Sequence, residues 1–204
     1  MLKRTGFTLV ELMISLSLSA VGIVMTASII ASTSSRLFNL DQVTRLQNEL
    51  NIVASILYKD IQNMEYDGIA VERLVSLSIG PSPFDDSVEI SHAAGEVANS
   101  CITFTSDLNK DGLLTSQSPN EHRGYRLRNG ALEVRQNGKY CNESGWQDLT
   151  STDSVIIESI TFTSSFSDAF PIANKVITVT ISASLPKHVN ITRHLEIKVV
   201  TNNA

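Results

Sequence analysis

A single carboxylate stands near the start of a long apolar run. Glu11 is the one charged residue between Thr5 and Ser35. As a helix, the uncharged run from Leu12 to Ser35, about 24 residues, is long enough to cross a hydrocarbon core of roughly 30 Å. An unpaired carboxylate in that setting costs at least a few kcal/mol, so Glu11 is a candidate functional group.

A second candidate is a row of alternating oxygen ligands that ends in Gly112, as in the first half of an EF-hand-type Ca²⁺ loop. The ligands would be Asp107, Asn109, Asp111 and the backbone carbonyl of Leu113. The match then fails, because the twelfth position is Ser118 and not a bidentate glutamate. Glu121 comes three residues late, although a longer loop could bring it in. The alternative is an Asx turn between two strands.

The two cysteines, Cys101 and Cys141, admit two interpretations. If the apolar run is an anchor, the rest of the chain faces an oxidising compartment, where disulfides persist. A bridge would close a loop of about 40 residues and stabilise the fold by roughly 3–4 kcal/mol. The alternative is a pair of free or metal-bound thiols, for which the absence of CxxC spacing is unfavourable.

The residues around the apolar run predict its orientation. Lys3 and Arg4 precede it and Arg36 follows it, which places the N-terminus on the cytoplasmic side. A secretory signal has a shorter apolar region with a small-residue cleavage site after it. Here the plausible cut lies before the run, at Gly6. The alternative is a plain signal anchor with Glu11 at the membrane interface.

The segment Gly6-Phe7-Thr8-Leu9-Val10-Glu11 resembles the prepilin cleavage and methylation motif of type IV pilins and type II secretion pseudopilins. The resemblance implies cleavage between Gly6 and Phe7 by a prepilin peptidase, followed by N-methylation of Phe7. It also implies that Glu11 neutralises the new N-terminus of a neighbouring subunit during assembly. An ammonium and a carboxylate, both costly in lipid, remove each other's cost by pairing between chains.

Two further features narrow the resemblance. Major pilins often carry a proline in this helix, but here Ser28 stands near that place and the first proline is Pro81. This favours a minor pilin or a pseudopilin. The run from Glu121 to Gly130, together with the cysteine pair and Trp146 after it, resembles PilW-like minor pilins and J-type pseudopilins. Some pseudopilins and minor pilins bind calcium, so the resemblance is compatible with a Ca²⁺ loop.

The periodicity of the chain predicts a long helix that continues beyond the apolar run. Apolar residues recur at steps of three and four, as on one face of an amphipathic helix. They are Leu37, Leu40, Val43, Leu46, Leu50, Val53, Leu57, Ile61 and Met64. Asp67-Gly68 is a stop signal. We therefore expect one helix of about 60 residues, with its second half against a sheet.

The remainder predicts an antiparallel β-rich head after an irregular region from Ile69 to Ala98 that holds one short strand at Val88–Ile90. Asn129-Gly130 and Asn137-Gly138 are turn signals between alternating runs. Further strands are expected at 101–105, 125–128, 131–135, 155–166, 177–185 and around Leu195–Val199, with Thr178, Thr180, Ser182 and Ser184 facing solvent.

The predicted fold class is α+β and pilin-like, with a long N-terminal helix packed against an antiparallel sheet. The expected parts are a removed leader (1–6), the membrane or filament-core half of the helix (7–35), its amphipathic half (36–67) and a periplasmic or extracellular head (68–204). The net charge is −5 and no basic tract follows the leader, so no direct nucleic-acid partner is expected.

The function expected from these features is that of a minor type IV pilin, which assembles into or primes a filament through its N-terminal helix. The alternatives are a type II secretion pseudopilin and a membrane-anchored periplasmic calcium-binding module that does not polymerise. No catalytic motif occurs, so an enzyme is not expected. Expected partners are other pilins, a prepilin peptidase and an inner-membrane assembly platform. The protein would lie in the inner membrane and then in the pilus at the cell surface, with Ca²⁺ as the one cofactor suggested.

Overall fold

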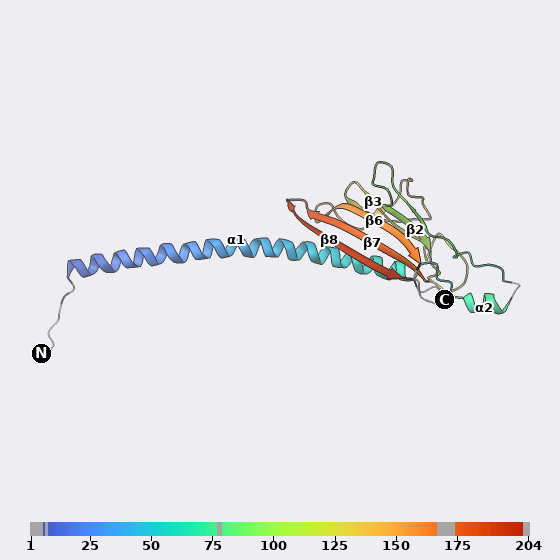
Figure 1. Ribbon diagram of the computed structural model, residues 1–204, viewed down its shortest axis with the longest axis horizontal. Coiled ribbons are helices and arrows are strands. Elements are labelled where there is room, and N and C mark those ends of the chain that lie inside the picture. The colour runs from blue at the N-terminus through green and yellow to red at the C-terminus, as the bar shows by residue number, and fades with distance from the viewer. Residues whose placement is uncertain (1–5, 7, 77–78, 167–173, 202–204) are drawn as a thin grey trace. The chain divides into compact units, whose positions relative to one another are not determined.

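The computed structural model describes residues 6, 8–76, 79–166 and 174–201 (Figure 1). The chain divides into two compact units, Met1–Thr44 and Arg45–Ala204. The helices are α1 (Leu9–Gln62) and α2 (Ala70–Val75). The strands are β1 (Glu89–Ser91), β2 (Cys101–Thr105), β3 (His122–Arg128), β4 (Ala131–Val134), β5 (Gln147–Asp148), β6 (Ile156–Phe166), β7 (Lys175–Leu185) and β8 (His188–Val200). The predicted α+β class, a long helix followed by antiparallel strands, is confirmed.

Within the second unit, α1 buries the stripe that its sequence predicts. Leu46, Leu50, Val53, Leu57 and Ile61 are all buried. Their spacing puts them on one face of the helix, which the two sheets cover. The earlier members of the stripe do not follow, because Leu37 and Leu40 are exposed.

The helix ends at Gln62, before the predicted stop signal at Asp67-Gly68. Glu65 adopts a left-handed backbone conformation, with φ of 61°, although it is not a glycine. Its N–H donates to the carbonyl of Thr105 at 2.8 Å, and the N–H of Asp107 donates to the carbonyl of Tyr66 at 2.9 Å. Tertiary hydrogen bonds to the end of β2 therefore replace the glycine cap that sequence reasoning looked for.

The strands form two antiparallel sheets, where the sequence predicted one. The first has the order β1-β2-β3-β4-β5 and the second the order β6-β7-β8. Alternating patterns identify strands but do not determine which strands pair. The division into two sheets could therefore not be predicted from them. Two backbone bonds connect β6 to segments that adjoin the first sheet: Ile157 N donates to Gly130 O in the β3–β4 turn, and Phe162 N donates to Asn99 O before β2, both at 2.8 Å.

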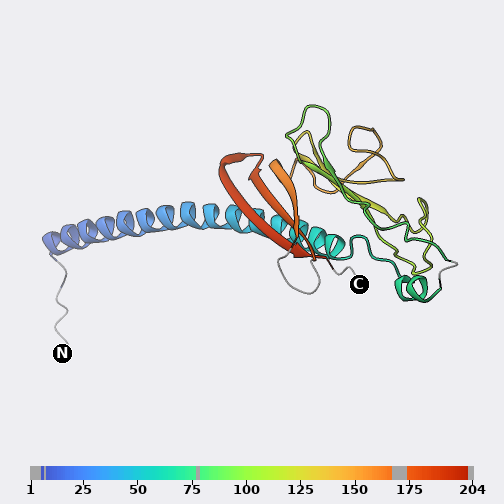
Figure 2. The same cartoon turned by 45° about the vertical axis from the view of Figure 1, so that its right-hand side comes forward.

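The three-stranded sheet lies directly against the C-terminal part of α1 in both views (Figures 1 and 2). Its inner face consists of buried apolar residues, mostly β-branched, that alternate with more exposed ones. These residues are Ile157, Ile160, Phe162, Ile177, Val179, Ile181, Ala183 and Val199. Ser184 departs from the predicted solvent-facing row and is buried, beside a shift in the β7–β8 register.

The turns follow their sequence signals. Asn129 and Gly130 have φ of 51° and 78°, and Asn137 and Gly138 have φ of 48° and 70°. Two consecutive positive φ values are what a two-residue hairpin requires, so the Asn129-Gly130 link between β3 and β4 is confirmed. The short strand predicted at Val88–Ile90 lies one residue later, as β1, and α2 appears in the region predicted to be irregular.

A polar contact also joins the end of α1 to the first sheet. Asp60 accepts hydrogen bonds from Arg123 Nε at 3.1 Å and Tyr125 Oη at 2.5 Å, and it pairs with Arg123 Nη2. Burial and the Asp60 carboxylate both raise the pKa of Tyr125, so its hydroxyl remains a donor. Arg123 and Tyr125 are two residues apart on β3 and so share one face of the strand.

Replacing Leu57 by alanine is expected to lower the free energy of unfolding by about 2–5 kcal/mol, because it leaves a cavity in the core. Ile52→Ala is the matched control, since Ile52 lies in the same helix but is 58% exposed. Its effect is expected to stay within about 0.5 kcal/mol. The measurement is urea denaturation of the full chain in detergent micelles, followed by circular dichroism. Equal losses for the two variants would contradict this packing.

Candidate functional site

The N-terminus of α1 is built around Thr8 and Glu11. Thr8 N and Thr8 Oγ1 both donate to Glu11 Oε2 at 3.1 Å, and Glu11 N donates to Thr8 Oγ1 at 3.3 Å. This reciprocal arrangement is a capping box, which satisfies donors that the first turn of a helix leaves free. Sequence analysis missed it, although Thr-x-x-Glu before an apolar run is its signal.

Of the two residues at the predicted cleavage site, Gly6 and Phe7, the structure describes only the first. Gly6 is exposed. Phe7 lies outside the described residues, so the cleavage and methylation expected there stay predictions. Glu11 has a local role as a capping residue, but a carboxylate offers about four acceptor positions. Glu11 can therefore hold Thr8 and still accept a cation from another chain.

Within the described residues, one segment is long and apolar enough to cross a membrane. It runs from Leu9 to Ser34, 26 residues with a mean hydropathy of 2.1, close to the N-terminus. The most hydropathic part of this segment has no residue buried within the protein, and its large aliphatic side chains are exposed. Such a surface needs lipid or other apolar helices around it. The anchoring expected of this segment is consistent with these properties.

Several hydroxyl groups inside this segment donate hydrogen bonds to the backbone of the helix itself. Ser15, Ser17, Ser19 and Thr26 each donate to a backbone carbonyl three or four residues earlier, at 2.7–3.0 Å. Ser28 does the same to the carbonyl of Met25 at 2.8 Å. In lipid no water is present to bind these groups, so internal bonds allow a serine-rich helix to remain apolar on its surface.

In the head, the structure joins Cys101 and Cys141 by a disulfide, with a Cα–Cα distance of 6.1 Å. Cys101 opens β2 and is fully buried. Cys141 belongs to the segment between β4 and β5, which has almost no regular structure of its own. The bond therefore fixes an irregular segment to a central strand, and the disulfide interpretation replaces the free-thiol alternative.

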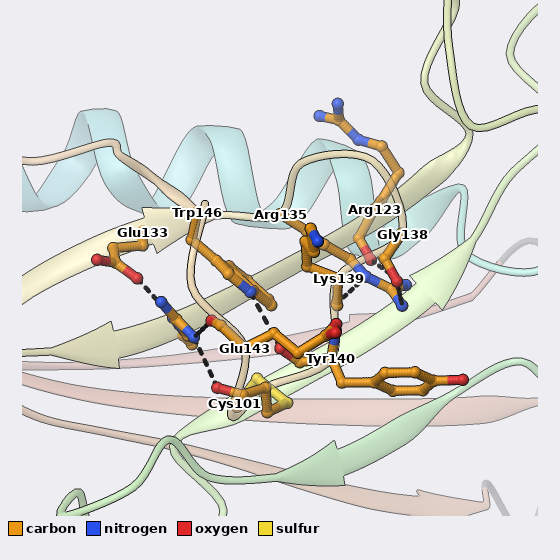
Figure 3. The surroundings of a disulfide bond; sticks show 11 residues. Cys101, Arg123, Glu133, Arg135, Gly138, Lys139, Tyr140, Glu143 and Trp146 are labelled. Atoms are coloured by element: carbon orange, nitrogen blue, oxygen red, sulfur yellow. Dashed lines mark hydrogen bonds and ion pairs between the residues drawn. A yellow bond between two sulfur atoms is a disulfide. The ribbon is translucent and has the colours of Figure 1, made fainter.

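Two arginines hold the same segment by its carbonyl groups (Figure 3). Arg126 Nη1 donates to the carbonyls of Cys141 and Glu143, both at 2.7 Å. Arg135 donates to the carbonyls of Lys139, at 2.7 Å, and Gly138, at 3.0 Å. Each guanidinium thus satisfies backbone acceptors that no strand neighbour reaches.

Arg126 is the centre of this network. It is 1% exposed, lies opposite Cys101 in the β2–β3 register, and its Nε donates to Glu133 Oε2 at 2.5 Å. The ring of Trp146 lies over the guanidinium, 4.6 Å away, in a cation–π contact. A buried charge needs such full pairing. Sequence analysis noted Trp146 only for its position after the second cysteine, and Arg126 carried no signal of burial.

The expected calcium ligands come together only in part. The nearest carboxylate oxygens of Asp107, Asp111 and Glu121 lie within 4.8 Å of one another. Glu121, which the twelve-residue pattern excluded, is thus brought in by the longer loop. Asn109 turns to its neighbour instead, and its Nδ2 donates to Asp111 Oδ2 at 2.7 Å. Leu113 donates its N–H to Asp111 Oδ1 at 2.8 Å.

The carboxylates of this loop already accept hydrogen bonds from backbone N–H groups. Asp107 accepts N–H groups from Gly68 and Gly112 at 2.9 Å and from Lys110 at 2.6 Å. Glu121, fully buried, accepts from Leu108 at 3.0 Å and from the N–H of Thr115 at 2.8 Å. The loop is therefore held as a set of Asx-type turns, and Ca²⁺ at Asp107, Asn109, Asp111 and the Leu113 carbonyl stays a prediction.

Comparison with known proteins bears on both parts of the chain. A prokaryotic N-terminal methylation motif matches residues 1–27, and the profile of prepilin peptidase-dependent protein B matches residues 39–201. The chain belongs to the prepilin peptidase-dependent protein B family. The prepilin peptidase-dependent protein B of Escherichia coli (strain K12) is 22% identical over 160 residues, which cover 77% of this chain and 76% of that protein. No solved structure matches the chain.

The resemblance seen in the first residues is therefore confirmed. The chain is a pilin-like protein with a prepilin-type methylation motif. The family match covers nearly all of the second unit, so the helix stripe, both sheets and the disulfide lie within the part of the chain that defines the family.

Arg126→Ala is expected to lower the free energy of unfolding by about 3–5 kcal/mol, because it leaves the Glu133 carboxylate and two carbonyls without their donor. Arg128→Ala, two residues further at the end of β3, is the control, and we expect a change within about 0.5 kcal/mol. Thermal and urea unfolding of the oxidised full chain give both values. A loss for Arg126→Ala no greater than the control would show that the network is not needed.

Calcium binding is tested by titrating the full chain in detergent with CaCl₂ in a calorimeter. The expected dissociation constant is on the order of 0.1–1 mM, as for extracellular calcium modules. Glu121→Gln should weaken binding, while Asp153→Asn at an exposed turn should not. No heat of binding at millimolar Ca²⁺ would end the calcium hypothesis and leave the turns as structure alone.

Proposed function

We propose that the protein is a minor type IV pilin, which enters or primes a filament through the N-terminal part of α1. The carrying observation is the exposed apolar segment Leu9–Ser34 with Glu11 in its first turn, which begins within the match to the prokaryotic N-terminal methylation motif. A segment with this composition is stable in two settings, a bilayer and a bundle of similar helices. Pilin assembly moves the segment from the first setting to the second.

The contacts of Glu11 support a role in that transfer. Cleavage after Gly6 would create an ammonium at Phe7, one residue before the capping box. Moved into an apolar bundle, that ammonium needs a carboxylate, and Glu11 is the one acidic residue between Thr5 and Ser35. The helix dipole favours the negative charge of Glu11 at this end. Pairing with the ammonium of a neighbouring chain would offset the cost of placing either charge unpaired in an apolar bundle.

The helix itself favours a minor subunit over a major one. α1 runs from Leu9 to Gln62 without a proline, and Ser28 occupies the region where major pilins often have one. Serine keeps the backbone N–H that a proline would lack, and α1 runs unbroken through this point. The partners proposed are a prepilin peptidase, other pilins and the inner-membrane assembly platform, and the proposed location is the inner membrane and then the pilus.

Two alternatives remain distinct in what they predict. A type II secretion pseudopilin would use the same cleavage and the same Glu11 pairing, but in a fibre that does not reach the cell surface. A membrane-anchored calcium module would keep its leader and would not depend on Glu11. The carboxylate cluster of Asp107, Asp111 and Glu121 is the observation that keeps the second alternative open.

The deciding measurement is mass spectrometry of the N-terminal peptide, in sheared surface filaments and in the membrane fraction. We expect a peptide that begins at N-methylated Phe7 in the filaments. Confinement of that peptide to the membrane fraction would favour a secretion pseudopilin or a priming subunit. An intact Met1 peptide in every fraction would exclude prepilin processing.

Glu11→Ala is expected to lower the filament-associated fraction about tenfold or more, because an unpaired ammonium in an apolar bundle costs at least a few kcal/mol. The variant should still insert in the membrane, since the apolar run is unchanged. Glu49→Ala, in the part of α1 that belongs to the head, is the control and should assemble normally. Normal assembly of Glu11→Ala would exclude the proposed pairing.

A further inference from the structure

The short helix α2 exposes aliphatic side chains that the fold does not use. None of its six residues is buried, and Val71, Leu74 and Val75 are exposed to 71%, 83% and 82%. A single helix of this length is not stable by itself in water. Its position must therefore come from contacts with the rest of the head, and those contacts are not the aliphatic ones.

Arg73 supplies those contacts. Its Nε donates to Asp67 Oδ2 at 2.6 Å and its Nη2 to the carbonyl of Gly112 at 2.5 Å. The arginine side chain is 11% exposed and the Asp67 side chain 4%. The helix is thus held from its inner side by a nearly buried ion pair, while Val71, Leu74 and Val75 face outward.

A cavity of about 340 Å³ opens beside α2. Its walls combine aliphatic surface with three carboxylates and the guanidinium of Arg73. The aliphatic part includes Ala70, Leu74 and Pro81, and the carboxylates are those of Glu65, Asp67 and Asp85. In both views α2 lies at the end of the second unit that is farthest from the start of its helical part (Figures 1 and 2). A partner can therefore reach the cavity without disturbing the core.

The three carboxylates differ in their ion-pair and hydrogen-bond partners. Glu65 pairs with Lys175 at 2.7 Å. Burial acts to raise the pKa of Asp67, but hydrogen bonds from Ser82 and Ile69 and the charge of Arg73 hold it below its ordinary value. Asp85 has no ion pair within the described residues.

Asp85 is therefore the carboxylate of this cavity that lacks an ion-pair partner among the described residues. Burial and the nearby charges of Asp67, Glu65 and Asp86 raise the pKa of Asp85, and the charge of Arg73 offsets this only in part. A cation placed at this carboxylate would relieve that repulsion. The aliphatic residues beside Asp85 favour a ligand that also has an apolar part. A small cation alone would leave Leu74 and its neighbours exposed to water.

We propose that α2 and this cavity form a docking surface for a segment of an adjoining filament subunit that presents a lysine or arginine beside aliphatic residues. The methylene stem of that side chain would lie along Leu74 and Pro81, with its charged end at Asp85. The aliphatic neighbours of the basic residue would cover Val71 and Val75. The inference rests on the proposed pilin function, because it assigns the partner to the same filament.

The experiment uses the full chain in the bacterium that assembles it. Leu74 is replaced by the photocrosslinking residue p-benzoylphenylalanine, and the same residue at Val97, an exposed position outside the surface, is the control. We expect a protein adduct from position 74, whose mapped peptide contains Lys or Arg next to aliphatic residues. Asp85→Lys should lower the adduct yield about tenfold or more, because like charges at an interface oppose binding. Asp153→Lys, the same change at an exposed turn, should not.

The final step is a charge exchange. Replacing the mapped basic residue by glutamate should restore the adduct in the Asp85→Lys background. A mapped peptide from a second copy of this chain, such as the exposed turn at Lys187, would support the surface with that copy as the partner. No adduct, a lipid adduct, or an adduct insensitive to Asp85→Lys would overturn the proposal.

Misfolding and loss of function are separated from this result by two readouts. The Cys101–Cys141 bond, followed by gel mobility without reductant, reports that the Asp85→Lys head has folded. The N-methylated Phe7 peptide in sheared filaments reports that the unmodified protein assembles. If that peptide is present and the adduct is absent, the docking surface is wrong while the pilin function stands.

Discussion

The packing of the α1 stripe against two sheets is the contact on which the head depends. Leu46, Leu50, Leu57 and Ile61 are all at most 1% exposed, and they belong to one buried cluster with residues from both sheets. The helix thus contributes to one buried core together with both sheets. The continuation of the same helix towards the N-terminus lacks such a cover, which is why its surface must find apolar surroundings elsewhere.

Charged groups in the head act mainly as clamps for segments without regular structure. Arg126 and Arg135 bind the carbonyls of the disulfide-linked segment, and Arg73 holds α2 against Asp67 and the Gly112 carbonyl. In each case the guanidinium satisfies acceptors that would otherwise be buried without a partner. Asp60 does the same work in reverse, since its carboxylate receives Arg123 and Tyr125 from β3. Asp85, by comparison, forms no ion pair within the described residues.

The carboxylates of the predicted calcium loop show how one set of residues supports two interpretations. Asp107 and Glu121 lie close enough to share a cation, yet they also accept the backbone N–H groups that shape the loop. Carboxylates arranged around a tight turn are suited to both tasks, because each oxygen has more than one acceptor position. The geometry of the loop therefore explains its shape with or without Ca²⁺.

Local patterns in the sequence determined a large part of this structure. The apolar run, the three-and-four spacing from Leu46 onward and the Asn129-Gly130 turn each depend on neighbours within a few residues, and each is present as predicted. The prepilin-type motif at Gly6–Glu11 was likewise readable, and the family match agrees with it. The capping box of Thr8 and Glu11 is also a local pattern, with its two residues three positions apart, but it was not predicted.

Only the tertiary structure decided the features that join residues far apart in the chain. The division into two sheets, the end of α1 at Gln62 and the burial of Arg126 result from pairings that a local pattern does not encode. Glu121 enters the Asp107 loop because the chain folds back beyond the twelve-residue spacing. The outward face of α2 is the same kind of result. The ion pair between Arg73 and Asp67, and not the hydrophobic pattern of the helix, determines the orientation of Leu74.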